Sequence, residues 1–155
     1  MVTVVVDAAN VMGSRPDGWW RDRAGAAVRL HEDLLRLAER GVRVPADGSG
    51  ESGESGGAGV SGGAGGDEPG EPGGDEAEFV LVIEGAARAA KSRMKPGKVR
   101  VVVARGSGDD AIVDLVRELP GLCVVVTADR ELRRRVGALG ASVLGPGWLL
   151  ARFRQ

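Results

Sequence analysis

The stretch Val2-Thr3-Val4-Val5-Val6-Asp7-Ala8-Ala9-Asn10 decides the fold of this chain. It is an apolar run that ends in an acidic residue, and three later runs have the same form. Runs of Val, Ile and Leu this continuous indicate strands buried on both faces, as in a parallel sheet covered by helices. The later runs are Phe79 to Ile83 before Glu84, Val99 to Ala104 before Asp109 and Asp110, and Leu122 to Thr127 before Asp129.

Helical patterns and turn-forming residues separate these runs. In the first helical pattern, apolar residues recur at helical spacing until Gly41, a typical stop residue. The alternation of strand and helix predicts one α/β domain of three layers, α/β/α and Rossmann-like, with a mainly parallel sheet. The other predicted elements are a loop at 13–18, helices at 19–40, 109–119 and 130–139, a strand at 142–144, and a last helix after Gly145-Pro146-Gly147.

Residues 46–78 differ in composition from the rest of the chain. They hold half of the 26 glycines and nine of the acidic residues, and no Lys or Arg. Such a segment cannot bury enough apolar surface to offset the entropy of ordering it, so we predict a disordered Gly/Ser/acidic insertion within a single domain over residues 1–155. Without it, 21 basic residues stand against 13 acidic ones, a formal charge of +8. That charge suits nucleic acid or nucleotides as partners, and an ordinary soluble surface explains it equally well.

Basic residues without an acidic neighbour follow the second strand, within residues 85–108. They would hold a phosphate backbone next to an acidic site, and the alternative is a solvated positive loop. The residues predicted to contact nucleic acid are Arg88, Lys91, Arg93, Lys95 and Arg105. Trp19-Trp20 beside Arg21 and Arg23 also suits base stacking, but anchoring of the first helix to the core is the favoured interpretation.

Composition excludes several classes of protein. Cys123 is the only cysteine, so an internal disulfide framework is excluded, and its place in an apolar run indicates a core residue. No stretch is long enough to cross a membrane, and the N-terminus lacks the basic start of a signal peptide. We therefore expect a cytoplasmic protein without membrane contact. His31, the only histidine, has no nucleophile paired with it and is expected to be solvated or at the core edge.

The carboxylates at the strand ends form the candidate site. The C-terminal ends of parallel strands open on one edge of the sheet, where ligand sites form, and carboxylates gathered there repel each other unless a cation joins them. Oxygen ligands without a Cys or His cluster favour Mg²⁺ or Mn²⁺. Taken singly, Asp109, Asp110 and Asp129 also suit helix caps, and Asn10 suits a turn. Glu84 is predicted to be an outer metal ligand or the partner of a nearby Arg.

These motifs resemble the NYN branch of the PIN-like nuclease superfamily, in its bacterial YacP-like form. The matching stretches, in the family's order, are Val4-Val5-Val6-Asp7-Ala8-Ala9-Asn10, Ser107-Gly108-Asp109-Asp110-Ala111-Ile112 and Val125-Val126-Thr127-Ala128-Asp129. The resemblance implies a strand order of 3-2-1-4-5, which sets Asp7 and Asp129 face to face at the switch point. It also implies that Asp7 and Asp129 bind the metal directly, that Asp109, Asp110 or both complete the set, and that Asn10 assists.

The resulting hypothesis is metal-dependent hydrolysis of phosphodiester bonds by a ribonuclease that acts on single-stranded RNA. One or two ions held by the carboxylates would activate water and stabilise the leaving oxygen. Two alternatives stay open, because fold alone does not settle activity. One is a nucleotide hydrolase of the NTP pyrophosphohydrolase type, and the other is an RNA-binding or protein-interaction module without turnover. A homodimer is also expected.

Overall fold

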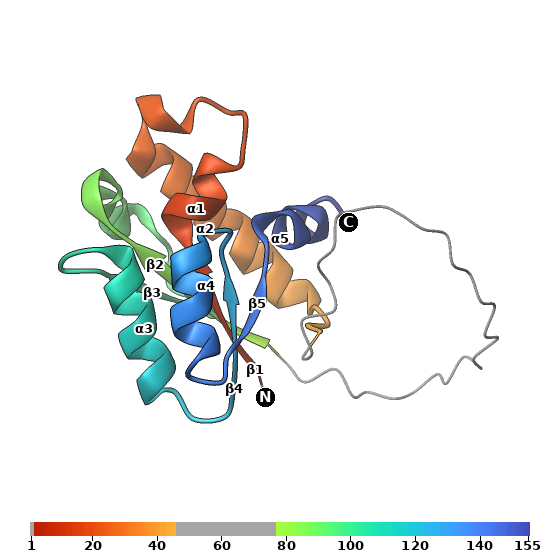
Figure 1. The fold of residues 1–155 in the computed structure, drawn as a ribbon. Coiled ribbons are helices and arrows are strands. Elements are labelled where there is room, and N and C mark those ends of the chain that lie inside the picture. Colours follow the sequence, from red (N-terminus) through yellow and green to blue (C-terminus); the bar gives the residue numbers. More distant parts are fainter. Residues whose placement is uncertain (1, 46–76) are drawn as a thin grey trace.

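The computed structural model describes residues 2–45 and 77–155, and its centre is a sheet of five parallel strands (Figure 1). The strand order is β3-β2-β1-β4-β5, so the first strand in sequence is the central one. This order and the α/β class confirm the predicted fold. The strands are β1 (Val2–Asp7), β2 (Ala77–Ile83), β3 (Val99–Val103), β4 (Leu122–Val126) and β5 (Ser142–Leu144).

Strand β1 is buried along its whole length because helices cover both faces of the sheet. Val4 and Val6 belong to one apolar cluster and Val5 to the other. This is the alternation expected of successive side chains in a strand. The unbroken run of valines in β1 is therefore a consequence of having no side that faces solvent.

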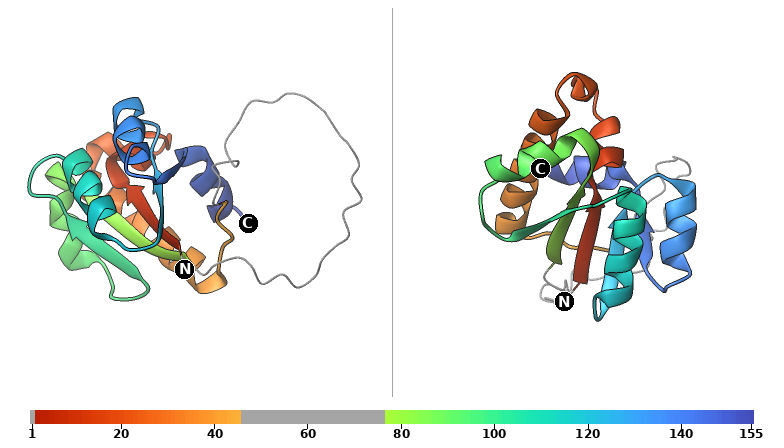
Figure 2. Two further views of the ribbon diagram at one scale, coloured as in Figure 1. Left: turned by 60° about the horizontal axis from the view of Figure 1, so that its bottom comes forward. Right: turned by 90° about the vertical axis from the view of Figure 1, so that its left-hand side faces the viewer.

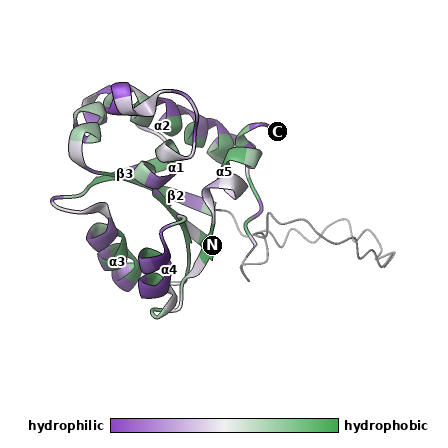
Figure 3. Ribbon diagram, turned by 45° about the horizontal axis from the view of Figure 1, so that its top comes forward, coloured by the Kyte–Doolittle hydropathy of each residue, from purple (hydrophilic) through white to green (hydrophobic). Residues whose placement is uncertain are grey.

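Two layers of helices enclose the sheet, as the views in Figure 2 show. In Figure 3 the strands are mostly hydrophobic, whereas α3 and α4 combine hydrophilic and hydrophobic residues, as outer layers do. The arrangement is the predicted α/β/α sandwich. Among the described residues, no helix is both long and apolar enough to cross a membrane. The cluster on one face includes residues of α1 (Ala8–Gly13), α2 (Arg23–Arg40), η2 (Gly85–Arg93) and α5 (Pro146–Phe153), and the cluster on the other includes residues of α3 (Gly108–Glu118) and α4 (Arg130–Gly137).

The segment predicted as one helix over 19–40 consists of two elements. Trp19–Arg21 form a 3₁₀ turn, η1, and α2 begins at Arg23. Asp22 separates them because its carboxylate accepts a hydrogen bond from the Gly25 N–H at 2.9 Å, which caps α2. The six-residue helix α1 directly after β1 is a further difference, since the sequence predicts no helix there.

His31 is buried in α2, so the expectation of a solvated or core-edge histidine is wrong. The residue is 1% exposed, and its Nε2 atom has no hydrogen-bond partner among residues 2–45 and 77–155. Burial lowers the pKa of the imidazole, an effect that outweighs the opposing influence of Glu32. His31 is therefore a neutral member of the core.

The disorder predicted for residues 46–78 falls mainly on residues 46–76, which lie outside the described part of the chain. The last two residues of that predicted insertion belong to the sheet instead. Ala77 and Glu78 begin β2 and pair with Val2 and Thr3 of β1. The predicted boundary is wrong by these two residues because the backbone forms the ladder, so a small and a charged side chain are sufficient at its end.

Gly25→Ala is expected to destabilise the protein through the cap of α2. A Cβ at this position would lie 2.3 Å from Asp22 Oδ2, so the carboxylate would have to leave the N–H that it caps. Loss of such a cap costs about 1–2 kcal/mol, measurable as a lower midpoint of urea unfolding. Gly147→Ala is the control, because Gly147 lies in α5 with open space around its Cβ position. That variant should gain up to about 1 kcal/mol in helix propensity, and equal midpoints for the two variants would contradict the prediction.

Candidate active site

Asp7 is the last residue of the central strand and the first residue of the candidate site. Its side chain lies at the carboxyl edge of the sheet, and the residue is only 6% exposed. One carboxylate oxygen accepts the Asn10 N–H at 3.4 Å, which caps α1, and the other accepts the Thr127 hydroxyl at 2.9 Å. Asp7 is therefore fixed between its own helix and the end of β4, the neighbouring strand.

Thr127 is a site residue that the sequence analysis gave no role. It is fully buried, and its hydroxyl both donates to Asp7 and accepts the Asp129 N–H at 3.1 Å. The Nε of Arg133 donates to the Thr127 carbonyl at 3.0 Å. Thr127 thus joins the carboxylate of β1 to the loop that carries Asp129. The sign of this role in the sequence is that the Thr127 hydroxyl lies two residues before Asp129, which caps a helix. Hydroxyl side chains in that position commonly hydrogen-bond the backbone of a turn.

Asn10 and Asp129 complete this contact between α1 and the loop after β4. The side-chain oxygen of Asn10 accepts the Ala128 N–H at 2.8 Å. Asp129 caps α4, because its Oδ1 accepts the Leu132 N–H at 3.1 Å, and its Oδ2 accepts no hydrogen bond from the described residues. The geometry therefore leaves one oxygen of Asp129 available to a ligand, and makes Asn10 a residue that positions the loop.

Asp109 and Asp110 point in different directions. The Asp110 carboxylate pairs with Arg135 of α4 at 3.0 Å, and its side chain is 70% exposed. Asp109 is partly buried and makes no hydrogen bond through its carboxylate within the described residues. Burial, Asp129 and Glu84 raise the pKa of Asp109, in that order of size. Of the two acids that the sequence could not separate, Asp109 is the one that faces the other strand-end carboxylates.

Glu84 follows β2 and contacts the start of α3. Its Oε2 accepts the Gly108 N–H at 2.6 Å, so it fixes the helix that carries Asp109. A Cβ on Gly108 would lie 3.0 Å from Glu84 Oε1, which shows how closely this carboxylate approaches the backbone. No Arg or Lys pairs with Glu84 among the described residues, so the predicted ion-pair alternative has no counterpart there.

Four carboxylates, those of Asp7, Glu84, Asp109 and Asp129, form what we call the acidic cluster. Burial is the main reason that the pKa of Asp7 rises to about 6. The hydrogen bonds from Thr127 and Asn10 oppose the rise, and the charges of Asp109 and Glu84 add to it. The cluster is therefore held together by the fold against the mutual repulsion of its members.

The donor set of the acidic cluster fits a hard divalent cation such as Mg²⁺ or Mn²⁺. All of its donors are carboxylate oxygens, and a cation would relieve the repulsion that adds to the effect of burial on the pKa values of Asp7 and Asp109. In residues 2–45 and 77–155, however, no three Asp, Glu, His or Cys side chains stand as a group that could hold a metal ion. Binding a cation would therefore require side chains of the acidic cluster to move closer together.

A basic surface begins where the acidic cluster ends. η2 starts at Gly85, immediately after Glu84, and buries Ala87 and Ala90 against the core. The basic residues between and after them are exposed, and Arg88, Lys91 and Arg93 lie on a 3₁₀ helix rather than on the loop of the alternative interpretation. None of these side chains forms an ion pair within the part of the chain that the structure describes. The exposed set includes all five predicted nucleic-acid contacts, Arg88, Lys91, Arg93, Lys95 and Arg105.

Comparisons with known proteins bear on the fold. No protein-family model matches the sequence, and no curated protein matches it. Among solved structures, the fold is similar to the crystal structure of a single-residue mutant of Rae1 (YacP) from Bacillus subtilis, with a TM-score of 0.62. The likeness covers 99% of this chain and 76% of that chain, at 14% sequence identity. At this low identity the comparison shows the fold alone, namely that this chain has a YacP-like fold.

Proposed function

We propose that this protein is a metal-dependent phosphodiester hydrolase that acts on single-stranded RNA. The observation that carries the proposal is that four carboxylates, from the ends of β1 and β2, the start of α3 and the loop after β4, gather at the edge of the sheet around the switch point between β1 and β4. Burial, with a smaller contribution from the neighbouring carboxylates, raises the pKa of Asp7 and of Asp109, which costs folding free energy. A fold that maintains such a cost at the edge where α/β proteins bind ligands is typical of a functional site. The fold shared with Rae1 (YacP) agrees with the nuclease resemblance of the motifs.

The acidic cluster would hold Mg²⁺ or Mn²⁺ through Asp7, Asp109 and Asp129, with Glu84 as an outer ligand. The ion, when bound, would lower the pKa of a water and stabilise the leaving oxygen. The chain's own residues supply the alignment. The hydrogen bonds of Thr127 and Asn10 fix Asp7 relative to the loop that carries Asp129. The hydrogen bond that Glu84 accepts from the Gly108 N–H fixes the start of α3, next to Asp109.

The basic surface favours a polymer over a free nucleotide as the substrate. η2 spans nine residues, which at the rise of a 3₁₀ helix is about 18 Å. The exposed cations of η2 extend from Arg88 to Arg93, about 10 Å at that rise, and Lys95 follows the helix. Cations spread in this way suit successive phosphates of a strand better than the compact phosphates of one nucleotide. Cytoplasmic location and a homodimer remain predictions.

Asp129→Asn is expected to abolish RNA cleavage, because it removes the carboxylate oxygen that is available to a cation. The measurement is a gel assay of purified protein on mixed-sequence single-stranded RNA with Mn²⁺, for wild type and variant, with and without EDTA. Cleavage by wild type that disappears in both the variant and the EDTA sample would support the proposal. Cleavage that persists in EDTA would contradict metal dependence. Release from NTPs but not from RNA would indicate a nucleotide hydrolase, and RNA binding without products under any metal would indicate a binding module.

A further inference from the structure

Trp20 is the most exposed of the large hydrophobic side chains described, with 57% of its surface accessible. From the sequence, both tryptophans are expected to anchor the first helix to the core, and only Trp19 does so. Trp19 packs against the core, and its ring lies 3.7 Å from the position that a Cβ on Gly13 would take. Trp20 does not reach the core. The indole of Trp20 therefore presents a large aromatic surface to solvent.

The ring of Trp20 is held in one orientation. It meets Trp19 edge to face, with ring centroids 6.3 Å apart and an interplanar angle of 88°. The guanidinium of Arg21 lies over Trp20 at 5.7 Å from the ring centroid, and that of Arg23 lies over Trp19 at 5.5 Å. Each ring is thus paired with a cation, and neither Arg21 nor Arg23 makes an ion pair within the described residues.

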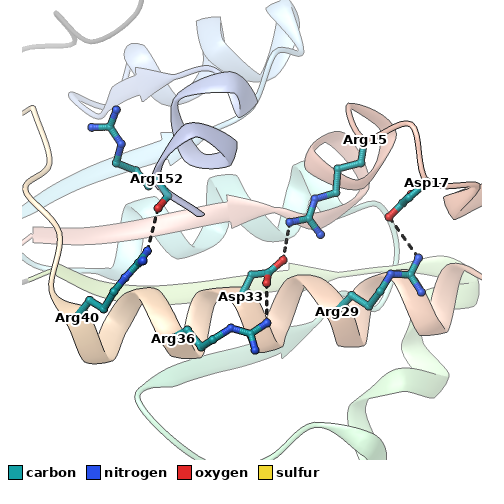
Figure 4. Close-up of polar contacts among 7 residues, drawn as sticks. All are labelled: Arg15, Asp17, Arg29, Asp33, Arg36, Arg40 and Arg152. Atoms are coloured by element: carbon teal, nitrogen blue, oxygen red, sulfur yellow. Dashed lines mark hydrogen bonds and ion pairs between the residues drawn. The ribbon is translucent and has the colours of Figure 1, made fainter. Parts of the chain in front are cut away.

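The loop before the tryptophans is fixed to α2, as Figure 4 shows. Arg15 pairs with Asp33 at 2.5 Å, and Arg29 pairs with Asp17 at 3.3 Å, so two ion pairs tie the loop to the helix. Gly18 then turns the chain into η1 with a φ of 71°, a conformation that favours glycine. Because the segment is already ordered, a ligand that contacts Trp20 does not have to order it.

The tryptophans lie near the acidic cluster. Asp7 caps the start of α1, and Trp19 contacts the end of α1 at Gly13. Six helical residues span about 9 Å along the axis. In Figure 1, α1 and the turn that leads to α2 project beyond the carboxyl end of β1, on the same edge of the sheet as the cluster. The path from Asp7 along α1 to Trp19 is therefore about 9 Å, and the ring of Trp20 lies a further 6.3 Å away, a separation that a few nucleotides of one strand would span.

We propose that Trp20 is a stacking platform for one unpaired base of the RNA strand whose phosphodiester lies at the acidic cluster. This inference rests on the proposed function and adds the selection of single strands to it. Every base has a π-face, so such stacking tolerates any sequence. In a duplex the faces of each base are covered by its neighbours, so Trp20 contributes nothing there. The cations of Arg21 and Arg23 then lie where phosphates of the same strand pass.

Trp20→Ala is expected to weaken binding of single-stranded RNA about ten- to a hundredfold, the usual range for loss of one stacked base. The measurement is the Kd from fluorescence anisotropy in EDTA, so that no turnover occurs. The probe is a short labelled RNA without self-complementarity, compared with the same RNA annealed to its complement. Trp20→Phe should keep most of the affinity because it keeps a ring. Leu139→Ala is the matched control, since Leu139 is also an exposed apolar side chain, at 41%, but lies after α4.

A loss confined to single strands, with Trp20→Phe and Leu139→Ala close to wild type, would support the stacking site. Wild-type affinity in Trp20→Ala would overturn it while leaving the proposed function intact. Equal losses for single strands and duplex would also overturn it, because they would indicate a general effect of the surface. If wild type binds neither RNA, the proposed function fails, and the stacking site fails with it. Unchanged thermal unfolding of Trp20→Ala would show that the fold is preserved.

Discussion

Asp109→Asn is expected to reduce RNA cleavage at least about a hundredfold, while Asp110→Asn keeps most of the activity. The two substitutions remove the same charge from adjacent residues of α3, so they form a matched pair. Asp109 faces the acidic cluster, and Asp110 faces Arg135. Loss even of a residue that only supports a metal ligand typically costs ten- to a hundredfold in activity or metal affinity, so loss of a direct ligand should cost more.

The measurement for this pair is the initial rate of cleavage of single-stranded RNA at saturating Mn²⁺. The midpoint of urea unfolding serves as the control, because both substitutions leave in place the hydrogen bond that the Asp110 N–H donates to the Ser107 hydroxyl, which caps α3. Two inactive variants would mean that both acids serve the site. A pattern in which only Asp110→Asn loses activity would refute the assignment of Asp109.

Asp7→Asn is expected to stabilise the fold at neutral pH while it abolishes cleavage. The pKa of Asp7 is about 6 in the folded protein and 3.8 as the reference value, so its ionised form is disfavoured by about 3 kcal/mol. The amide removes that cost but weakens the hydrogen bonds with Thr127 and Asn10, which together are worth about 1–2 kcal/mol. A net gain of about 1–2 kcal/mol in the free energy of unfolding is expected at pH 7 in EDTA.

The gain from Asp7→Asn should depend on pH in a defined direction. Between pH 3.8 and about 6 the folded protein binds a proton at Asp7 more readily than the unfolded chain does. The cost is therefore fully present above the folded pKa and disappears as the pH falls toward the unfolded one. Urea unfolding of both proteins at pH 7.5 and pH 4 would test this. A gain that is equal at the two pH values, or a variant less stable than wild type at pH 7.5, would contradict the explanation.

The sheet could be predicted from the sequence because its strands are buried on both faces. Continuous apolar runs then coincide with strands, and β1 to β4 lie where the runs predict them, within two residues. The short helical elements α1 and η1 could not be predicted, since six and three residues show no periodicity. α1 forms because Asp7 caps it locally and because Val11 and Met12 pack into the core, and this packing is a tertiary contact.

The positions of the acidic residues could be predicted, but their directions could not. Asp109 and Asp110 differ by about 100° around α3, so one faces the cluster and the other does not. Which of the two residues faces the cluster depends on the rotation of α3 about its axis. The hydrogen bond from the Gly108 N–H to Glu84 sets this rotation. Thr127 was missed because a β-branched residue at the end of an apolar run also suits a strand. Its hydroxyl acquires a role only once β1 and β4 are neighbours.

Strand β1 is synthesised first but lies at the centre of the sheet. Its neighbours β2 and β4 begin at Ala77 and Leu122. Synthesis proceeds at roughly 5–20 residues per second, so the central strand waits on the order of ten seconds for its second partner. Pairings this distant in sequence slow folding, and an unpaired apolar strand invites aggregation. An incomplete chain that stops before Leu122 therefore has a valine-rich strand with one unpaired edge. Val2–Asp7 is then the segment through which such incomplete chains aggregate.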